Sequence, residues 1–524
     1  MKHKFLGSVV AAALMSTTLM AEGTMLQRFE AMEKEMNALK AELASMKAEK
    51  TAPVTAKKAV AEDDDADEKP AKASAGKVKV AVQKDDEEKS IPEQLEDIHD
   101  QLSTLNKRTN GNAIKWDVDF RTTVDNINYK MADGSKQTND ALFTNRLWLG
   151  MNYAATKHLS FTGQLAYNKT FGQRSMVNPA TAGMEGFDWI SSEAAYDDKL
   201  RVRSAYFYYQ DSEFLGADIP WTISVGRRPS TEGHLVNLRE NDQASSPLAH
   251  TINVEFDGAS AKFGMEEVTG LTGSYFKLCA GRGMSAAEPR FGAAPYSDQN
   301  ATTNNIDMAG IIVVPYDDKQ YSVGMQYTYA NNLIDLINPM SPTDFSMKSV
   351  GGLHTATAFA MVNGIGNGWS DFLDDSLIFV SGAMSKTDPY ANKGGMLGST
   401  DSKTGYSYWI GTQFPSLISD EGRWGVEFNH GSNYWRPITY GEDTLIGSKL
   451  AARGDAYEAY FTEPLVGDIL TFQLRYTYID YKYGGSNGFF GDTGTPTAIS
   501  SSMGNAANYV DKAQDIRAYI RYKF

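Results

Sequence analysis

The decapeptide DIRAYIRYKF, residues 515–524, stands at the carboxyl end of the chain. Successive side chains of a β-strand point to opposite faces, so this segment separates into two faces. The apolar face carries Ile516, Ala518, Ile520, Tyr522 and Phe524, and the polar face carries Asp515, Arg517, Tyr519, Arg521 and Lys523. This division suits a strand with hydrocarbon on one side and water on the other. A half-exposed edge strand of a soluble sheet has the same alternation, so the other segments have to decide between the two.

The same two-residue period recurs along the chain from Ala113 onward. In residues 114–121, apolar side chains alternate with mostly charged ones. Further stretches of this kind cover residues 142–153, 159–169, 200–210, 220–227, 252–264, 270–280, 306–316, 320–330, 351–363, 374–384, 404–414, 422–431, 453–462, 468–483 and 509–524. Together they predict about 16 strands, an even number like that of single-chain outer-membrane barrels.

The links between these stretches differ in length in a regular way. Short links such as 317–319 and 463–465 alternate without exception with long links such as 170–199 and 484–508. A soluble sandwich has no reason to sort its links by length, whereas a membrane barrel has short periplasmic turns and long external loops. Residues 111–524 are therefore predicted to form an all-β transmembrane barrel of antiparallel strands, with both of its ends on the periplasmic side.

Residues 1–21 have the pattern of a signal peptide. Lys2 and Lys4 precede a mostly apolar and small-residue stretch, and Ala21 offers a small residue for cleavage. No later run of about 18 apolar residues could form a membrane-spanning helix. The sequence therefore predicts an exported protein that crosses a membrane with strands, in the Gram-negative outer membrane.

Two heptad segments lie between the signal peptide and the barrel. The predicted divisions are an α-helical coiled coil at 22–50, an acidic disordered linker at 51–89 and a second short coiled coil at 90–110. The core positions, at alternating steps of four and three, are Phe29, Met32, Met36, Leu39 and Leu43, and then Leu95, Ile98 and Leu102. Flanking charges favour parallel helices, and Leu at a with Ile at d favours a trimer or tetramer. A single amphipathic helix on another surface is the alternative for the first segment.

Composition and motifs exclude several functional classes. The net charge of -15 argues against a nucleic-acid partner, which would favour a basic face. Neither Gly-x-Ser-x-Gly nor His-Glu-x-x-His occurs, and the histidines of the barrel are scattered. Cys279 is the only cysteine, which excludes a disulfide framework. We therefore predict no enzyme, no catalytic residue, no metal site and no cofactor.

Three segments resemble strands of Gram-negative porins, namely 145–149 (NRLWL), 201–206 (RVRSAY) and 225–229 (VGRRP). The order of signal peptide, coiled coil, acidic linker and Tyr- and Gly-rich barrel is similar to that of a porin-like outer-membrane family. The ending Ile520, Tyr522, Phe524 resembles the signal that the barrel assembly machinery reads in porins. The resemblance implies a homotrimer in outer-membrane lipid that lets small hydrophilic solutes or ions diffuse passively through a water-filled channel.

In such porins the third external loop folds into the lumen opposite a wall of arginines, and the corresponding loop here covers about residues 228–250. The predicted constriction consists of Glu232, Arg239, Glu240 and Asp242 in that loop, with Arg146, Arg201 and Arg203 facing it. Other predicted lumen residues are Asp117, Asp119, Lys277, Glu427, Glu458, Arg475, Arg517 and Arg521. An acidic loop against basic walls would screen solutes by size and charge. A solvated external surface is the alternative for the loop charges, and the mixed signs leave the ion preference open.

A structural role is the alternative function. The periplasmic coiled coil could link the outer membrane to the cell wall, with peptidoglycan as its partner, while the barrel acts as an anchor. This tether is compatible with a channel.

Overall fold

The computed structural model describes residues 114–171, 199–230, 232–285, 304–336, 347–439, 443–484 and 494–524. The predicted signal peptide, both coiled-coil segments and the acidic linker lie outside the described residues. Within the described ranges, no helix combines the length and the apolar character that a membrane crossing requires.

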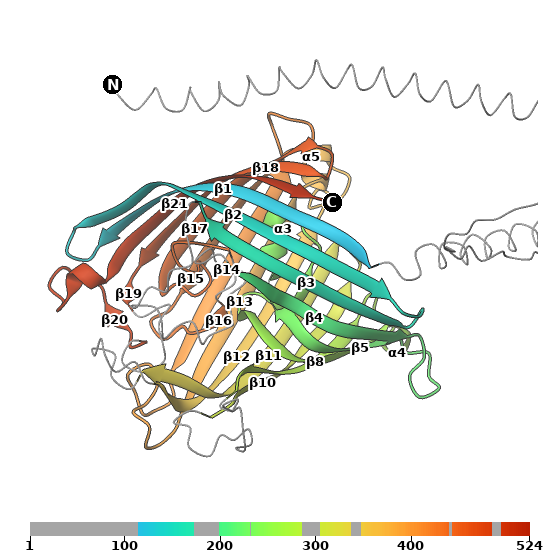
Figure 1. The fold of residues 1–524 in the computed structure, drawn as a ribbon, viewed down its shortest axis with the longest axis horizontal. Coiled ribbons are helices and arrows are strands. Elements are labelled where there is room, and N and C mark those ends of the chain that lie inside the picture. Colours follow the sequence, from blue (N-terminus) through green and yellow to red (C-terminus); the bar gives the residue numbers. More distant parts are fainter. Residues whose placement is uncertain are drawn as a thin grey trace, which may run out of the picture. The chain divides into compact units, whose positions relative to one another are not determined.

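Sixteen antiparallel strands pair in chain order in the described part of the chain, and the pairing of the first with the last closes them into a ring (Figure 1). The strands of the ring are β1 Lys115–Met131, β2 Lys136–Ala154, β3 Leu159–Thr170, β4 Leu200–Asp211, β5 Trp221–Ser230, β8 Ile252–Gly264, β9 Tyr275–Met284, β10 Ile306–Asp317, β11 Tyr321–Leu336, β12 Met347–Asn363, β13 Leu377–Pro389, β14 Thr404–Pro415, β15 Arg423–Gly431, β17 Gly454–Val466, β18 Leu470–Tyr481 and β21 Val510–Lys523. A closed ring has no unpaired strand edge. The predicted barrel of about 16 strands is therefore confirmed.

Short elements occupy the links between these strands. They are β6 Gly233–His234, α3 Val236–Glu240, β7 Ser245–Leu248, α4 Glu266–Thr269, α5 Asp371–Asp374, β16 Ile438–Thr439, β19 Tyr483–Gly484, β20 Thr497–Ala498 and the 3-10 helix η1 Ala506–Asn508. β6 pairs with β7, and β16 pairs in parallel with the start of β8. The links that matter for the lumen are thus those that contain β6 to β7 and β16.

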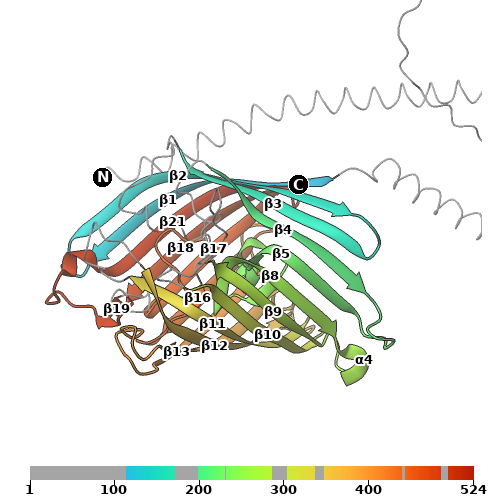
Figure 2. The same cartoon turned by 60° about the horizontal axis from the view of Figure 1, so that its bottom comes forward.

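The links emerge at two opposite ends of the barrel. We call the end where β1 begins and β21 stops the terminal end, and the opposite end the far end. Figure 2 shows α4 at the terminal end and β19 at the far end. The far-end links include loop 3 (231–251, between β5 and β8) and loop 7 (432–453, between β15 and β17).

The predicted alternation of short and long links is broken at two places: at the first far-end link, and at the far-end link 337–346, which is shorter than the terminal-end link 364–376 that follows it. The first far-end link covers only 132–135, because β1 and β2 continue well past their predicted ends and stay paired out to Lys130 and Lys136. Backbone hydrogen bonds continue a hairpin whatever its side chains are, and β1 also pairs with β21 as far as Met131 opposite Val510. The residues that looked like a polar loop are therefore strand.

The outer face of the ring is apolar, as the two-residue period predicts. In β13, burial alternates residue by residue, and Ile378, Val380 and Met384 point outward. Large exposed apolar side chains recur in the same way on other strands, among them Tyr408 and Ile410 of β14. A continuous apolar exterior is the surface that a bilayer requires of a barrel.

The inner face is mixed rather than uniformly polar, which differs from the wet interior that the period alone suggests. Phe359, Phe379 and Trp409 point inward and are buried in one cluster with Leu235 and Val236 of loop 3. A side chain that meets a loop in the lumen no longer faces water, so apolar residues become favourable there. The lumen thus has an apolar core of its own.

Candidate functional site

Four arginines from three neighbouring strands form one patch of the inner face, which we call the arginine wall. They are Arg121 of β1, Arg475 of β18, and Arg517 and Arg521 of β21, and all four are buried. The strand register places Arg121 opposite Arg521, and Arg475 opposite Arg517. Side chains directly opposite each other start about 5 Å apart, so these like charges require carboxylates nearby.

Two carboxylates of β1 neutralise part of this charge from within the ring. Arg517 Nε donates to Asp125 Oδ1 at 2.5 Å, and Arg521 Nη2 donates to Asp119 Oδ2 at 2.6 Å. Arg146 of β2 also donates to Asp119, at 3.2 Å. Charge-assisted hydrogen bonds are stronger than neutral ones, so these pairs hold the arginine side chains independently of the loops.

Loop 3 folds into the lumen and brings two further carboxylates to the arginine wall. Glu240 lies 3.7 Å from Arg475 Nη1 and 3.9 Å from Arg521 Nη1, and it accepts a hydrogen bond from the Tyr519 hydroxyl. Asp242 lies 2.9 Å from Arg521 Nη2. The acidic end of loop 3 therefore faces the basic side of the barrel.

Loop 3 is also held by a cluster of charged side chains from loop 7, β15 and β17, which we call the ionic knot. Arg239 of loop 3 donates to Glu458 of β17 at 3.0 Å. Lys449 of loop 7 donates to the same Glu458 at 2.5 Å and to Glu427 of β15 at 2.7 Å. All four side chains are buried. Because a buried charge is costly unless it is paired, the knot ties both loops and two strands into one unit.

Loop 7 supplies a fifth carboxylate that meets the arginine wall. Asp443 accepts two hydrogen bonds from Arg121, at 2.6 and 2.7 Å, and lies 3.2 Å from Arg517 and 3.9 Å from Arg475. Its backbone carbonyl also accepts from Arg475 and Arg517, both at 2.9 Å. One loop residue thus contacts three of the four arginines.

The carboxylates of Glu240 in loop 3 and Asp443 in loop 7 both stay ionised. Burial alone would raise the pKa of Glu240, but Arg239 and the arginine wall outweigh it and lower the pKa to about 2. The same competition holds the pKa of Asp443 well below its usual range. Glu240 and Asp443 are therefore negatively charged at neutral pH.

The two histidines of loop 3 are neutral at physiological pH. His250 is buried between the hydroxyls of Ser381 and Ser407, which lie 2.8 and 2.9 Å from its ring nitrogens. The His234 ring packs edge-on against Phe359. Burial lowers the pKa of His250 to about 3 and that of His234 to about 4. These side chains are therefore part of the apolar attachment of the loop.

The backbone of loop 3 is held in an unusual conformation. Glu232, Leu235 and Asn241 have φ values of 55°, 84° and 53°. A residue other than glycine with positive φ costs on the order of 1–3 kcal/mol. Contacts on both sides of the loop, including Gln473 Nε2 donating to the Arg239 carbonyl at 2.9 Å, compensate this cost.

Only some of the predicted constriction residues meet the partners that the sequence predicted for them. Arg203 lies 3.5 Å from Glu232, so one predicted wall arginine does meet loop 3. Arg146 instead binds Asp119, and its guanidinium lies 3.5 Å from the ring centre of Trp148. Arg201 lies in β4 opposite Ala166 of β3 and is half-buried. Glu240 and Asp242 meet the arginine wall because loop 3 crosses the lumen towards β18 and β21.

The predicted lumen residues lie mainly on the inner face. Asp119, Lys277, Glu427, Glu458, Arg475, Arg517 and Arg521 are buried inside the ring. Lys277 Nζ donates to Ser246 Oγ of loop 3 at 2.5 Å. Asp117 is at the terminal end, where Asn152 donates to it at 3.2 Å, and it is only half-buried.

Three functional candidates were not predicted from the sequence. Arg121 has the same strand parity as Asp119, so the alternation of β1 could have identified it. Asp443 and Lys449 lie in a loop, where no periodicity indicates which residues turn inward. Their importance follows from the contacts that loop 7 makes.

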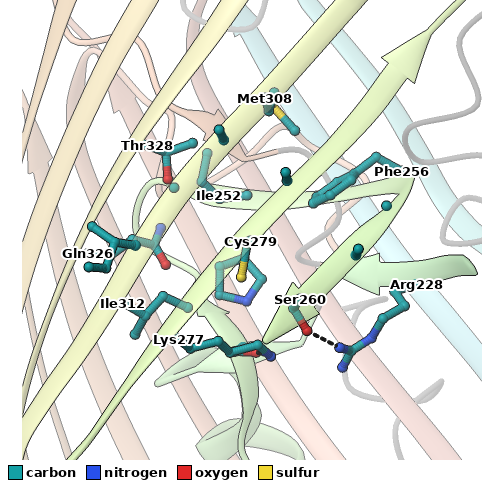
Figure 3. Close-up of a pocket in the computed structure, with 18 residues that line it drawn as sticks. Arg228, Ile252, Phe256, Ser260, Lys277, Cys279, Met308, Ile312, Gln326 and Thr328 are labelled. Atoms are coloured by element: carbon teal, nitrogen blue, oxygen red, sulfur yellow. Dashed lines mark hydrogen bonds between the residues drawn. The ribbon is translucent and has the colours of Figure 1, made fainter. Parts of the chain in front are cut away.

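A small cavity separates loop 3 from the wall formed by β8 to β11 (Figure 3). Its volume is about 50 Å³, and Lys277, Cys279, Met308 and Gln326 are among its lining residues. Arg228 donates to Ser260 at its edge, at 2.7 Å. A space of this size holds only a few waters, so it is a gap under the loop rather than a solute route. In the described ranges, no group of three or more His, Cys, Asp or Glu residues is arranged to hold a metal ion.

A family model described as a protein of unknown function, DUF3373, matches residues 136–524. The chain belongs to the DUF3373 family. The match spans β2 to β21 and therefore includes both inward loops and most of the arginine wall of this DUF3373 protein. A search of curated proteins finds no match to the chain.

Solved structures similar to this DUF3373 protein are outer-membrane proteins. The OmpF complex of Salmonella typhi with daunomycin is 12% identical, with 79% of this chain and 99% of that chain covered and a TM-score of 0.41. OprB of Pseudomonas putida is 11% identical, with 81% and 97% covered and a TM-score of 0.44. OmpT of Vibrio cholerae is 11% identical, with 78% and 98% covered and a TM-score of 0.39.

Proposed function

We propose that this DUF3373 protein is an outer-membrane porin that lets small hydrophilic solutes or ions diffuse passively through a water-filled channel. The observation that carries the proposal is the closed ring of strands with an apolar exterior and charged residues inside. Such a ring satisfies its backbone hydrogen bonds within a bilayer. Charged side chains of both signs inside it offer a path that apolar solutes would avoid.

We propose that the route is narrowed by loop 3 beside the arginine wall. Glu240 lies 3.7 Å from Arg475, and Asp242 lies 2.9 Å from Arg521. Opposite charges at these distances produce a strong transverse field. Glu232 with Arg203 would form a second charged pair along the same loop. The further predicted constriction residues, Arg146, Arg201 and Arg239, would act by holding the walls and the loop.

The assembly proposed for the protein is a homotrimer in outer-membrane lipid. The terminal residues Ile520, Tyr522 and Phe524 are exposed on the outer face of β21, with Phe524 74% exposed. This exposure supports their proposed role as the signal for the barrel assembly machinery. With external loops at the far end, the terminal end would face the periplasm, together with the coiled coil.

A structural tether is the second candidate, and the heptads at 22–50 and 90–110 favour it. In this proposal, Phe29 to Leu43 and Leu95 to Leu102 form the parallel coiled-coil core, and peptidoglycan is the partner. Deletion of residues 25–109 should then loosen the envelope while solute uptake is unchanged. Loss of uptake with an intact envelope would argue for a role of the coil in the channel instead.

Planar lipid bilayers provide the test of the channel. Purified full-length protein should give discrete conductance steps, and a salt gradient should then give the charge selectivity. Absence of steps from folded, heat-modifiable protein would overturn the proposal. Activity on lipid or peptide substrates would instead point to an enzyme, which we do not propose because the sequence has no catalytic motif.

A further inference from the structure

One carboxylate in the lumen occupies a pocket that is built for an anion. Asp443 lies among Arg121, Arg475 and Arg517, which come from β1, β18 and β21, three strands that run side by side (Figure 1). Arg121 binds its two carboxylate oxygens with two separate nitrogens. This two-pronged geometry is the one by which guanidinium groups recognise carboxylates and phosphates.

The pocket has more donors than Asp443 uses. Arg121 Nε and Arg475 Nε are buried and have no hydrogen-bond acceptor among the described residues. Arg121 and Arg475 are only 4% and 1% exposed. A buried donor without an acceptor costs about 1–3 kcal/mol, so an oxyanion with more oxygen atoms than a carboxylate would gain contacts there.

The occupant of the pocket is easier to move than its walls. Asp443 belongs to loop 7, its side chain is 15% exposed, and its φ of 56° is unfavourable for most residues. Loop 7 has other attachments, because Lys449 joins the ionic knot and Ile438 N donates to the Thr251 carbonyl at 2.9 Å. The arginines, in contrast, are fixed on strands of the closed ring.

Carboxylates around the pocket do not fill it. Asp125 takes Arg517 Nε at 2.5 Å, on the β1 side. Glu240 approaches Arg475 only to 3.7 Å, from loop 3. Asp515 lies 4.0 Å from Arg517 Nε. Each of these groups approaches a single nitrogen of one arginine, whereas Asp443 occupies the space between the three guanidinium groups.

We propose that the pocket of Arg121, Arg475 and Arg517 is a binding site for a small oxyanion solute, a phosphate or a carboxylate, and that Asp443 is its internal occupant. The inference rests on the proposed channel and names the class of solute that it favours. An incoming oxyanion displaces the Asp443 side chain, makes the unused donor contacts, and leaves when Asp443 returns. No bond is made or broken in this exchange.

The main test compares Asp443→Asn with the unchanged protein in planar bilayers. Asparagine keeps the size, tolerates positive φ and keeps the backbone carbonyl that accepts from Arg475 and Arg517. Inorganic phosphate and acetate are titrated against a chloride current. We expect the half-blocking phosphate concentration to fall about tenfold in Asp443→Asn, the change that 1.4 kcal/mol produces, because the internal competitor is gone.

Two further variants define the controls. Asp307→Asn removes one negative charge from the exposed ion pair between Asp307 of β10 and Arg282 of β9, and it should leave the phosphate response unchanged. Arg475→Gln in the otherwise unchanged protein should raise the half-blocking phosphate concentration, and this arm remains informative if Asp443→Asn does not fold.

The outcomes separate the inference from the channel itself. Conductance steps with the same phosphate block in Asp443→Asn and in the unchanged protein would overturn the inference and leave the channel standing. A change that is equal for chloride, acetate and phosphate would also overturn it, since the pocket would then be a general charge effect. If no form gave steps, the channel would fail, and phosphate calorimetry on detergent-solubilised protein would decide whether the pocket binds an oxyanion.

Discussion

Loop 3 is held between two sides of the lumen that differ in chemistry. On one side, Glu240 meets the charged groups of β18 and β21. On the other side, Leu235 and Val236 pack on Phe359 and Phe379 of β12 and β13. The apolar side can hold the loop without charge, and the charged side can face solutes. Position and selectivity are thereby assigned to different parts of the barrel.

The two sides also differ in how they contribute free energy. Burial of one large apolar side chain stabilises by about 1.5–3 kcal/mol. A buried ion pair contributes little net stability, but removal of one partner is strongly destabilising because the other charge stays buried. We therefore expect the apolar side to provide the docking free energy of loop 3. The charged side should destabilise conformations in which the loop is docked incorrectly.

The largest effect should follow from a cavity on the apolar side. Phe379→Ala removes a side chain that is 2% exposed and packs edge-on against Trp409. The free energy of unfolding in lipid vesicles should fall by about 3–5 kcal/mol, and loop 3 should become sensitive to protease. The outward neighbour Val380, 49% exposed, is the control, because lipid fills the space after Val380→Ala. Equal losses in both variants would mean that the inner cluster does not hold the loop.

A slightly smaller loss is expected in the ionic knot. Glu458→Gln leaves Arg239 and Lys449 buried with less negative charge, at the lower end of about 3–5 kcal/mol. The measurement is again urea unfolding in vesicles. Asp307→Asn breaks an exposed pair, both partners 48% exposed, and should cost about 1 kcal/mol or less. If Glu458→Gln lost no more free energy of unfolding than Asp307→Asn, the distinction between buried and exposed ion pairs would not hold.

The charged side should control the charge selectivity of the channel. Glu240→Gln combined with Asp242→Asn removes the acidic end of loop 3 and leaves the arginine wall in excess. One charge about 4 Å away contributes about 1 kcal/mol in water, so the reversal potential in a salt gradient should shift to a roughly fivefold higher preference for anions. A shift towards cations would place these carboxylates outside the solute route.

The smallest effect is a dependence of loop docking on pH. His250 has a pKa of about 3 in the docked loop and an ordinary value of 6.5 when released. In the released loop His250 therefore binds a proton that it does not bind in the docked loop. The docking of loop 3 weakens as the pH falls below 6.5. Between pH 6.5 and 5.0, where Glu240 stays ionised in both states, the loss should be about 1–2 kcal/mol.

Protease sensitivity of loop 3 measures this effect. His250→Gln should reduce its slope with pH without removing it, because His234 titrates in the same direction with a pKa of about 4. Sensitivity that increases towards higher pH would contradict the sign of the expected change.

The strands illustrate what a periodic pattern can predict. The stretch 252–264 coincides with β8, and 159–169 differs from β3 by one residue at its end. Lipid outside the ring imposes apolar residues at every second position, so the strand leaves a local trace in the sequence. The hairpin of β1 and β2 beyond the predicted ends lacks this trace, because its outward positions in β1 are the polar residues Asn126, Asn128 and Lys130, whereas Ile127 and Met131 are buried inside.

The lumen contacts were predicted only in part for a related reason. Parity identified Arg475, Arg517 and Arg521 as inward, but it did not indicate which carboxylate each would meet. Asp443 is distant from Arg475 and Arg517 in the sequence and reaches both because loop 7 turns inward. Ion pairs between a loop and a strand depend on the path of the loop, which no local pattern encodes.

The sequence by itself predicted the barrel, a count of about 16 strands, and the face on which alternate residues of the periodic stretches lie. The reason is that the bilayer acts on every strand separately, through burial of alternate side chains. Only the tertiary structure decided that loops 3 and 7 enter the lumen, that Phe359 and Phe379 form an inner core, and that Asp443 lies among three arginines. These features depend on contacts between residues brought together by ring closure, and such contacts exist only after the chain has folded.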